Sequence, residues 1–184
     1  ATFVAQLCHQ LGVPGTVARQ DVAEIARRRK GNLEEVARDV RREFLEATAK
    51  ERNCDLIVLG HHAGDQAETF LMRLARGAGV DGLSAMNPRR VQFGITWVRP
   101  FLRIERSALR TYLRAAQIDW CEDPSNENRD FERIRVRDAL TVLGSLGVHA
   151  STLADVAQNM SSAREALDWQ TFLAAQDAAT LVFG

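Results

Sequence analysis

Cysteine is scarce in this sequence, and the positions of its cysteines exclude two common uses. The three residues, Cys8, Cys54 and Cys121, are widely spaced and odd in number, so they form neither a disulfide framework nor a CxxC metal pair. A signal peptide is also missing, and no apolar run reaches the roughly 18 residues that cross a membrane. We therefore expect a cytoplasmic protein without a membrane partner.

The sequence has no net charge either, because its 24 Lys and Arg residues balance 24 Asp and Glu residues. Affinity for nucleic acid must then come from local clusters of basic residues. Most of the basic residues are arginine, which suits planar contacts with phosphate or carboxylate groups. The length of 184 residues predicts one domain, or one domain with a helical appendage.

Helices and strands alternate along the first part of the chain. We expect a first helix to end at Gly12–Gly15 and Thr16–Arg19 to form a short strand. Asn32, with Glu35 three residues later, caps a helix that we expect to end near Arg52. The apolar run Leu56–Leu59 then predicts a strand covered on both faces. This alternation indicates a parallel sheet with crossover helices.

A hairpin and further helices are predicted after this region. Val91–Phe93 and Ile95–Val98 are expected to form strands around Gly94, followed by a helix from about Glu105 to Ala116. A predicted boundary at Gly144–Gly147 separates a domain of residues 1–143 from a helical connector of residues 144–184. In the connector, apolar residues at helical spacing predict one long amphipathic helix. They are Leu153, Val156, Ala157, Met160, Ala163 and Leu167.

The candidate site follows the Leu56–Leu59 strand, because ligands of open α/β sheets bind beyond the carboxyl ends of strands. A helix is expected to start near Asp65. Its spacing predicts a buried side formed by Ala67, Phe70, Leu71 and Leu74. The opposite side would carry His61, Asp65, Glu68 and Met72.

Two interpretations of this helix start remain open. Asp65 and Glu68 have the spacing of a capping box, in which Asp65 accepts from the Glu68 amide, but both carboxylates could instead orient an amine-bearing substrate. His61 and His62 could bind a metal with the nearby acids. Alternatively, a neutral histidine could contact a nucleotide at this helix terminus, which attracts anions.

The glycine pattern Gly77–Gly82 has the form GxGxxG but follows a helix instead of preceding one, so it is not a dinucleotide fingerprint. We interpret Gly77 as the end of the helix, with Arg73 and Arg76 near its negative terminus.

Several arginines are grouped along the chain. Arg27–Gly31 is interpreted as a basic loop, and Arg38, Arg41 and Arg42 flank a helix. Near the turn Asp123–Asn126 lie Arg129, Arg133, Arg135 and Arg137. Such groups are usually a solvated surface, yet they could equally contact phosphates.

The order of these segments resembles the tRNA(Ile)-lysidine synthetases, members of the PP-loop (N-type ATP pyrophosphatase) superfamily. The resemblance rests on five segments: Asn32–Arg41, GHHAGDQAETFLMRLARGAGVDGL from Gly60 to Leu83, Arg99–Leu102, Asp123–Asn126 and Arg133–Arg137. The string GHHxxDQxET followed by RLxRGxGxxGL is specific, whereas each shorter motif is weak by itself. The resemblance implies a doubly wound, Rossmann-like α/β fold of the adenine nucleotide alpha hydrolase type, with a C-terminal helical connector.

The resemblance also implies a reaction. The family uses ATP and Mg²⁺ to adenylate C2 of the wobble cytidine of tRNA(Ile) with a CAU anticodon, after which the ε-amine of L-lysine displaces AMP. On the matching motifs, Arg41 is the ATP-binding arginine, His61 is the catalytic and ATP-contacting histidine, and Asp65 and Glu68 are the catalytic, substrate-orienting acids. For substrate and tRNA we expect contacts from Arg38, Arg76, Arg133, Arg135 and Arg137.

The chain also departs from the family pattern. The Ser-Gly-Gly-x-Asp-Ser loop is missing, since the sequence contains no Gly-Gly at all. The aspartate that binds Mg²⁺ is expected in that missing loop, so we expect no metal ligands here and an N-terminally truncated, inactive fragment. Gly64 stands where relatives often have an acid, and Thr141 near where they often have proline. Sheet edges exposed by lost strands would favour a homodimer.

Two other functions remain open. The first is another PP-loop tRNA-modifying enzyme of the thiolase type, which would typically need catalytic cysteines. The second is a non-catalytic remnant that binds RNA or a protein through its arginines and its exposed helix.

Overall fold

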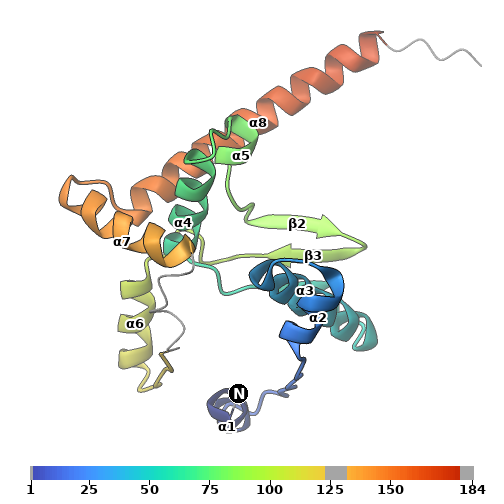
Figure 1. The fold of residues 1–184 in the computed structure, drawn as a ribbon, viewed down its shortest axis with the longest axis vertical. Coiled ribbons are helices and arrows are strands. Elements are labelled where there is room, and N and C mark those ends of the chain that lie inside the picture. Colours follow the sequence, from blue (N-terminus) through green and yellow to red (C-terminus); the bar gives the residue numbers. More distant parts are fainter. Residues whose placement is uncertain (1, 123–131, 179–184) are drawn as a thin grey trace, which may run out of the picture. The chain divides into compact units, whose positions relative to one another are not determined.

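The computed structural model describes residues 2–122 and 132–178 (Figure 1). The predicted turn Asp123–Asn126 and Arg129 lie outside these residues. The helices are α1 (Thr2–Gln10), α2 (Val22–Arg29), α3 (Leu33–Glu51), α4 (Ala63–Leu74), α5 (Val80–Leu83), α6 (Arg106–Ala115), α7 (Glu132–Ser145) and α8 (Ala150–Ala178). The strands are β1 (Leu56–Val58), β2 (Arg89–Gln92) and β3 (Ile95–Val98).

The strands form a three-stranded sheet in the order β1-β3-β2. The Thr96 amide donates to the Asp55 carbonyl (2.7 Å) and the Leu59 amide to the Val98 carbonyl (2.9 Å). Because the paired positions advance together along both strands, β1 and β3 are parallel. The predicted α/β class is confirmed, with an antiparallel hairpin added to the parallel pair.

The hairpin between β2 and β3 turns at Phe93 and Gly94, which have φ values of 50° and 78°. Positive φ at both central residues is the mark of a type I′ turn, whose twist matches that of the strands. The predicted hairpin is therefore confirmed, although β2 begins earlier than expected, at Arg89.

Two local predictions near the N-terminus were wrong. Thr16–Arg19 is not a strand, and the arginines that we interpreted as a basic loop form the last turn of α2. The Asp21 carboxylate caps this helix by accepting from the Glu24 amide, and Lys30 ends it in the left-handed region (φ 50°). The basic last turn is favoured because it faces the negative end of the helix dipole.

The chain divides into two compact units. The first consists of Ala1–Ile57 and Val91–Trp97, and the second of Val58–Arg90 and Val98–Gly184. In the first unit, α2 packs against α3, and Arg29 of α2 donates to both carboxylate oxygens of Glu43 of α3 (3.1 Å each). This hydrogen-bonded pair raises the pKa of Arg29 and lowers the pKa of Glu43.

The strand β1 is covered less than its sequence predicts. Ile57 is 7% exposed, but Leu56 and Val58 are 49% and 59% exposed. The prediction that both faces are covered was therefore wrong, because the side chains of Leu56 and Val58 on one face remain about half exposed. An apolar run indicates that a strand is suited to burial. Whether it is buried depends on other segments of the chain, which the run itself does not predict.

The core of the second unit lies where α4 packs against α8. It contains Ala67 and Phe70 of α4, Ala85, and Leu153 and Ala157 of α8. The first half of α8 thus belongs to this core, while its second half extends past α5 (Figure 1). That second half exposes large side chains that include Leu167 (57%), Trp169 (58%) and Phe172 (50%).

Side chains of the second unit clamp the segment that follows α4. The Gln66 amide donates to the Met86 carbonyl and accepts from the Met86 amide, both at 3.0 Å. Arg164 of α8 donates to Ser84 (2.9 Å) and to Asn87 (3.1 Å). Gly77 has the predicted left-handed conformation (φ 70°), but it does not cap the helix, because α4 ends at Leu74 with Ala75 as its C-cap residue.

Within residues 2–122 and 132–178, no helix by itself has both the length and the apolar composition of a membrane span. Glu132–Ser145 and Ala150–Gln176, bent by 103°, satisfy both criteria as a pair.

Candidate functional site

The start of α4 differs from the predicted one. His62, and not Asp65, is the N-cap residue: its Nδ1 accepts from the Gly64 amide (3.0 Å). The His62 amide in turn donates to Oδ2 of Asp65 (2.9 Å), so the two residues cap the helix reciprocally. The helix therefore begins at Ala63, and Asp65 lies in its first turn.

This cap also indicates which ring nitrogen of a neutral His62 carries the proton. Nδ1 lies 3.7 Å from Asp65 Oδ2, a separation that would be an ion pair if Nδ1 carried a proton. The shorter hydrogen bond from the Gly64 amide requires a lone pair on Nδ1 instead. We therefore assign the proton of a neutral His62 to Nε2.

Gly64 is explained by the same ring. A Cβ atom at position 64 would lie 2.7 Å from Cε1 and 2.9 Å from Nδ1 of His62. Glycine is thus needed for the observed orientation of the imidazole. An acid at this position requires a different orientation of His62.

Replacing Gly64 with alanine should displace the His62 ring with little change in stability. Loss of the cap costs about 1 kcal/mol, and alanine regains up to about the same amount as the better helix former. The ¹⁵N NMR shifts of the imidazole should show the loss of the Nε2-protonated tautomer. Gly79→Ala is the matched control, because nothing lies within 4 Å of a Cβ there. Unchanged His62 shifts in Gly64→Ala would contradict this account.

Glu68 was predicted on the exposed side of α4, and this was wrong. Its side chain is 3% exposed and pairs with Arg137 of α7, whose side chain is 38% exposed. Nε and Nη2 of Arg137 lie 2.9 Å and 2.8 Å from the same oxygen, Oε1. The second oxygen, Oε2, is buried and has no hydrogen-bond donor among the described residues. Glu68 is covered because α7 packs against α4 on this side.

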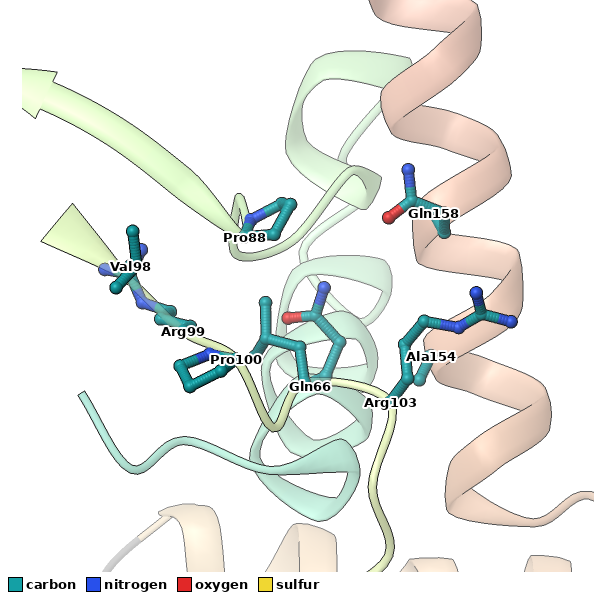
Figure 2. A pocket seen from close by; sticks show the side chains of 9 residues that line it. Gln66, Pro88, Val98, Arg99, Pro100, Arg103, Ala154 and Gln158 are labelled. Atoms are coloured by element: carbon teal, nitrogen blue, oxygen red, sulfur yellow. The ribbon is translucent and has the colours of Figure 1, made fainter. Parts of the chain in front are cut away.

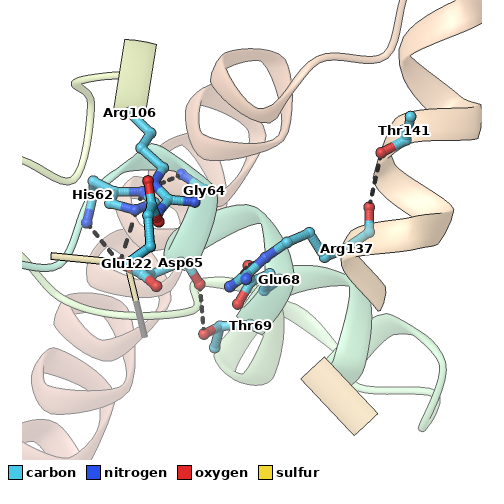
Figure 3. Close-up of polar contacts among 9 residues, drawn as sticks. All are labelled: His62, Gly64, Asp65, Glu68, Thr69, Arg106, Glu122, Arg137 and Thr141. Atoms are coloured by element: carbon cyan, nitrogen blue, oxygen red, sulfur yellow. Dashed lines mark hydrogen bonds and ion pairs between the residues drawn. The ribbon is translucent and has the colours of Figure 1, made fainter. Parts of the chain in front are cut away.

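These residues line a cavity of about 430 Å³. Asp65 and Glu68 come from α4, Arg137 and Thr141 from α7, Arg106 from the start of α6, and His149 precedes α8. Figure 3 shows the Arg137 side chain directed at Glu68, with Asp65 and His62 one turn away. The second turn of α4 therefore carries a buried, paired carboxylate, and its first turn carries a partly exposed one.

Arg106, which the sequence did not single out, is held by Glu122 (2.9 Å). Glu122 also bonds to Arg110 and accepts from Nε1 of Trp120 (3.0 Å). The hydrogen bond from Trp120, with the nearby Arg110 and Arg106, holds the pKa of Glu122 below its ordinary value. The only sequence signal for Arg106 was its position at the start of a helix.

The predicted tRNA-binding arginines are distributed over both units. Arg38 and the predicted ATP ligand Arg41 are exposed on α3, in the first unit. In the second unit, Arg76 pairs with Glu132 (2.6 Å), and Arg133 and Arg135 lie on α7 beside Arg137. His61 is half-buried in the same unit, directly before the N-cap residue of α4.

A second cavity of about 220 Å³ lies in the second unit. It is bordered by Gln66 of α4, Gln158 of α8 and the segment from Val98 to Arg103 (Figure 2). Arg99 donates to the Asn87 carbonyl (2.9 Å). Burial lowers the pKa of the Arg99 guanidinium, and the positive charge of Arg90 lowers it to a smaller extent. None of the residues predicted to be catalytic lines this cavity, so the larger one is the candidate site.

The described residues contain no group of three or more His, Cys, Asp and Glu side chains placed to hold a metal. Asp65 and Glu68 each already have one oxygen engaged, by the His62 amide and by Arg137 respectively. They do not fit as ligands of Mg²⁺, which prefers an octahedron of oxygen ligands.

Several known proteins are similar to this chain in sequence. A tRNA(Ile)-lysidine synthase of Ruegeria pomeroyi is 54% identical over 148 residues, which cover 80% of this chain and 35% of that protein. That of Zymomonas mobilis is 36% identical over 93% of this chain and 51% of its own length. That of Pseudomonas aeruginosa is 37% identical over 93% and 37%. The chain thus spans about a third to a half of these relatives.

The fold has a solved counterpart. The U34-tRNA thiolase NcsA from Methanococcus maripaludis with its [4Fe-4S] cluster superposes with a TM-score of 0.68, over 89% of this chain and 55% of that one. Its sequence identity of 14% supports a shared fold alone. The model of the PP-loop domain family matches residues 1–143. The chain therefore belongs to the PP-loop domain family.

Proposed function

We propose that this chain is part of a tRNA(Ile)-lysidine synthase, a ligase that consumes ATP to join L-lysine to C2 of the wobble cytidine in tRNA(Ile) with a CAU anticodon. One observation carries the proposal: the larger cavity places the carboxylates of Asp65 and Glu68 together at the start of α4. Relatives that share up to 54% identity with the chain bear this name. For a reaction on tRNA we also propose a cytoplasmic location.

The reaction requires two steps. The C2 oxygen of cytidine first attacks the α-phosphorus of ATP and pyrophosphate leaves, which makes the oxygen a good leaving group. The ε-amine of lysine then attacks C2, and AMP departs with the electron pair of the C2–O bond. The amine must be held close to C2 and must lose a proton, and a carboxylate can do both.

Asp65 is suited to this role by its hydrogen bonds. Oδ2 accepts from the His62 amide, which fixes the side chain at the helix start, while no described residue donates to Oδ1. Oδ1 can therefore accept a hydrogen bond from a lysine ammonium and afterwards take its proton. In this proposal Glu68 is the second acid at the amine, His61 contacts ATP and the reacting groups, and Arg41 binds ATP.

For tRNA we propose the basic residues of α3 and α7. Arg38, Arg133 and Arg135 would contact phosphates, and Arg76 could do so after release from Glu132. Mg²⁺ would enter with ATP, and its protein ligands would not be among the described residues. A thiolase activity has no comparable support, because none of the three cysteines lines either cavity.

The test measures AMP formed by the intact protein from ATP with tRNA(Ile) transcript, with and without L-lysine, and sequences the product RNA by mass spectrometry. We expect lysine on the wobble cytidine and AMP in equal amount. Asp65→Asn should lower the rate by about 10²–10⁴-fold if Asp65 takes the proton. Arg28→Gln, an exposed change on α2, should leave the rate unchanged. Product RNA without lysine would refute the proposal.

A further inference from the structure

Neither oxygen of Glu68 is available to a substrate in the observed arrangement. Oε1 receives both Nε and Nη2 of Arg137, at 2.9 Å and 2.8 Å. Oε2 is closed to solvent and receives no hydrogen bond from the described residues. A carboxylate that orients an amine must first expose an acceptor. If the Glu68–Arg137 pair had only a structural role, hydrogen-bond donors to both Glu68 oxygens would stabilise it better.

Arg137 is the partner that can move. Its side chain is 38% exposed whereas that of Glu68 is 3% exposed, so the guanidinium can return to water while the carboxylate cannot. The two residues belong to different helices and both line the larger cavity, and Figure 3 shows the Arg137 side chain directed at Glu68. The other arginine that lines this cavity, Arg106, is held by Glu122.

We propose that Arg137 occupies the cation position of Glu68, so that a primary ammonium group binds Glu68 in competition with this guanidinium. An ammonium group brings three N–H donors and one positive charge, and thus replaces what Glu68 loses when Arg137 leaves. The identification of the ammonium as the ε-group of lysine rests on the proposed function. In competition of this kind, the apparent affinity equals the intrinsic affinity multiplied by the fraction of molecules in which Arg137 has moved aside.

The experiment titrates the 184-residue chain and its variants with L-lysine and with n-butylammonium, using calorimetry and thermal unfolding. Arg137→Ala vacates the cation position, so it should bind both compounds about tenfold or more tightly than the unchanged chain. Its melting temperature should also rise more steeply with n-butylammonium, because the ligand binds only the folded state. Arg137→Lys keeps a competing cation and should bind like the unchanged chain.

Two controls isolate the carboxylate. Tetramethylammonium has the same charge but no N–H donor, and it should not raise the melting temperature of Arg137→Ala. The double variant Glu68→Met/Arg137→Met lacks the acceptor and should gain no affinity for either amine. If Arg137→Ala does not fold, Glu68→Gln removes the negative charge but keeps an oxygen for Arg137, and it should bind n-butylammonium more weakly than the unchanged chain; equal binding would overturn the proposal.

Weaker or equal amine binding by Arg137→Ala would overturn the proposal, as would a gain of affinity in the double variant. These outcomes are independent of lysidine formation. If Arg137→Ala gains affinity for n-butylammonium while the intact protein attaches no lysine to tRNA, the competition stands and the proposed reaction fails. If lysine is attached but Arg137→Ala gains no affinity, the reaction stands and the competition fails.

Discussion

Changing Phe70 to alanine should lower the free energy of unfolding of the second unit by about 3–5 kcal/mol, as for other buried aromatic residues. Phe70 is 5% exposed and packs with Ala67, Ala85, Leu153 and Ala157. Its neighbours include three alanines, whose short side chains cannot reach into the space that the ring would leave. The cavity should therefore persist, and urea unfolding followed by circular dichroism should report the loss.

Leu74 on the same helix is the matched control. It was predicted to be buried but is 49% exposed, so Leu74→Ala should cost about 1 kcal/mol or less. If the two variants lose equal stability, α4 does not pack against α8 through the face that carries Phe70.

Breaking the Glu68–Arg137 pair should have the second large effect, and the two single changes should differ. Arg137→Met leaves a carboxylate that is 3% exposed without its counter-charge, at a cost of about 3–5 kcal/mol. Glu68→Met leaves a guanidinium that is 38% exposed and can be hydrated, so its cost should be smaller.

The double variant Glu68→Met/Arg137→Met should recover most of the loss, because two apolar side chains can replace the pair. The coupling energy from this double-mutant cycle, measured by urea unfolding, gives the strength of the pair. Additive costs, with no recovery in the double variant, would show that the two side chains do not interact in solution.

The elements of the fold were largely predictable because their signals are local. The Asn32 cap, the apolar spacing of α4, Gly77 with its positive φ, and the hairpin at Gly94 each depend on a few neighbouring residues. The errors arose where the outcome depends on other segments. The Leu56–Val58 strand is apolar, but its exposure is decided by which elements pack on it.

The candidate site shows the same division. His61, Asp65 and Glu68 could be selected from a motif and a resemblance, and Asp65 and Glu68 do line one cavity. The capping box that begins at Asp65 was one of two open interpretations, and the observed N-cap residue, His62, is not of a usual N-cap type. The burial of Glu68 and its pairing with Arg137 join positions that are 69 residues apart, and no local pattern encodes such a contact.

The place of Leu153 and Ala157 in the core has a consequence for biosynthesis. A ribosome completes α4 long before it adds the first half of α8, and Phe70 has no such partners during that interval. The apolar face of α4 therefore stays uncovered on the nascent chain until α8 has left the exit tunnel. Chaperones that bind exposed apolar segments should act on this protein in that window, and folding of the second unit should be late and cooperative.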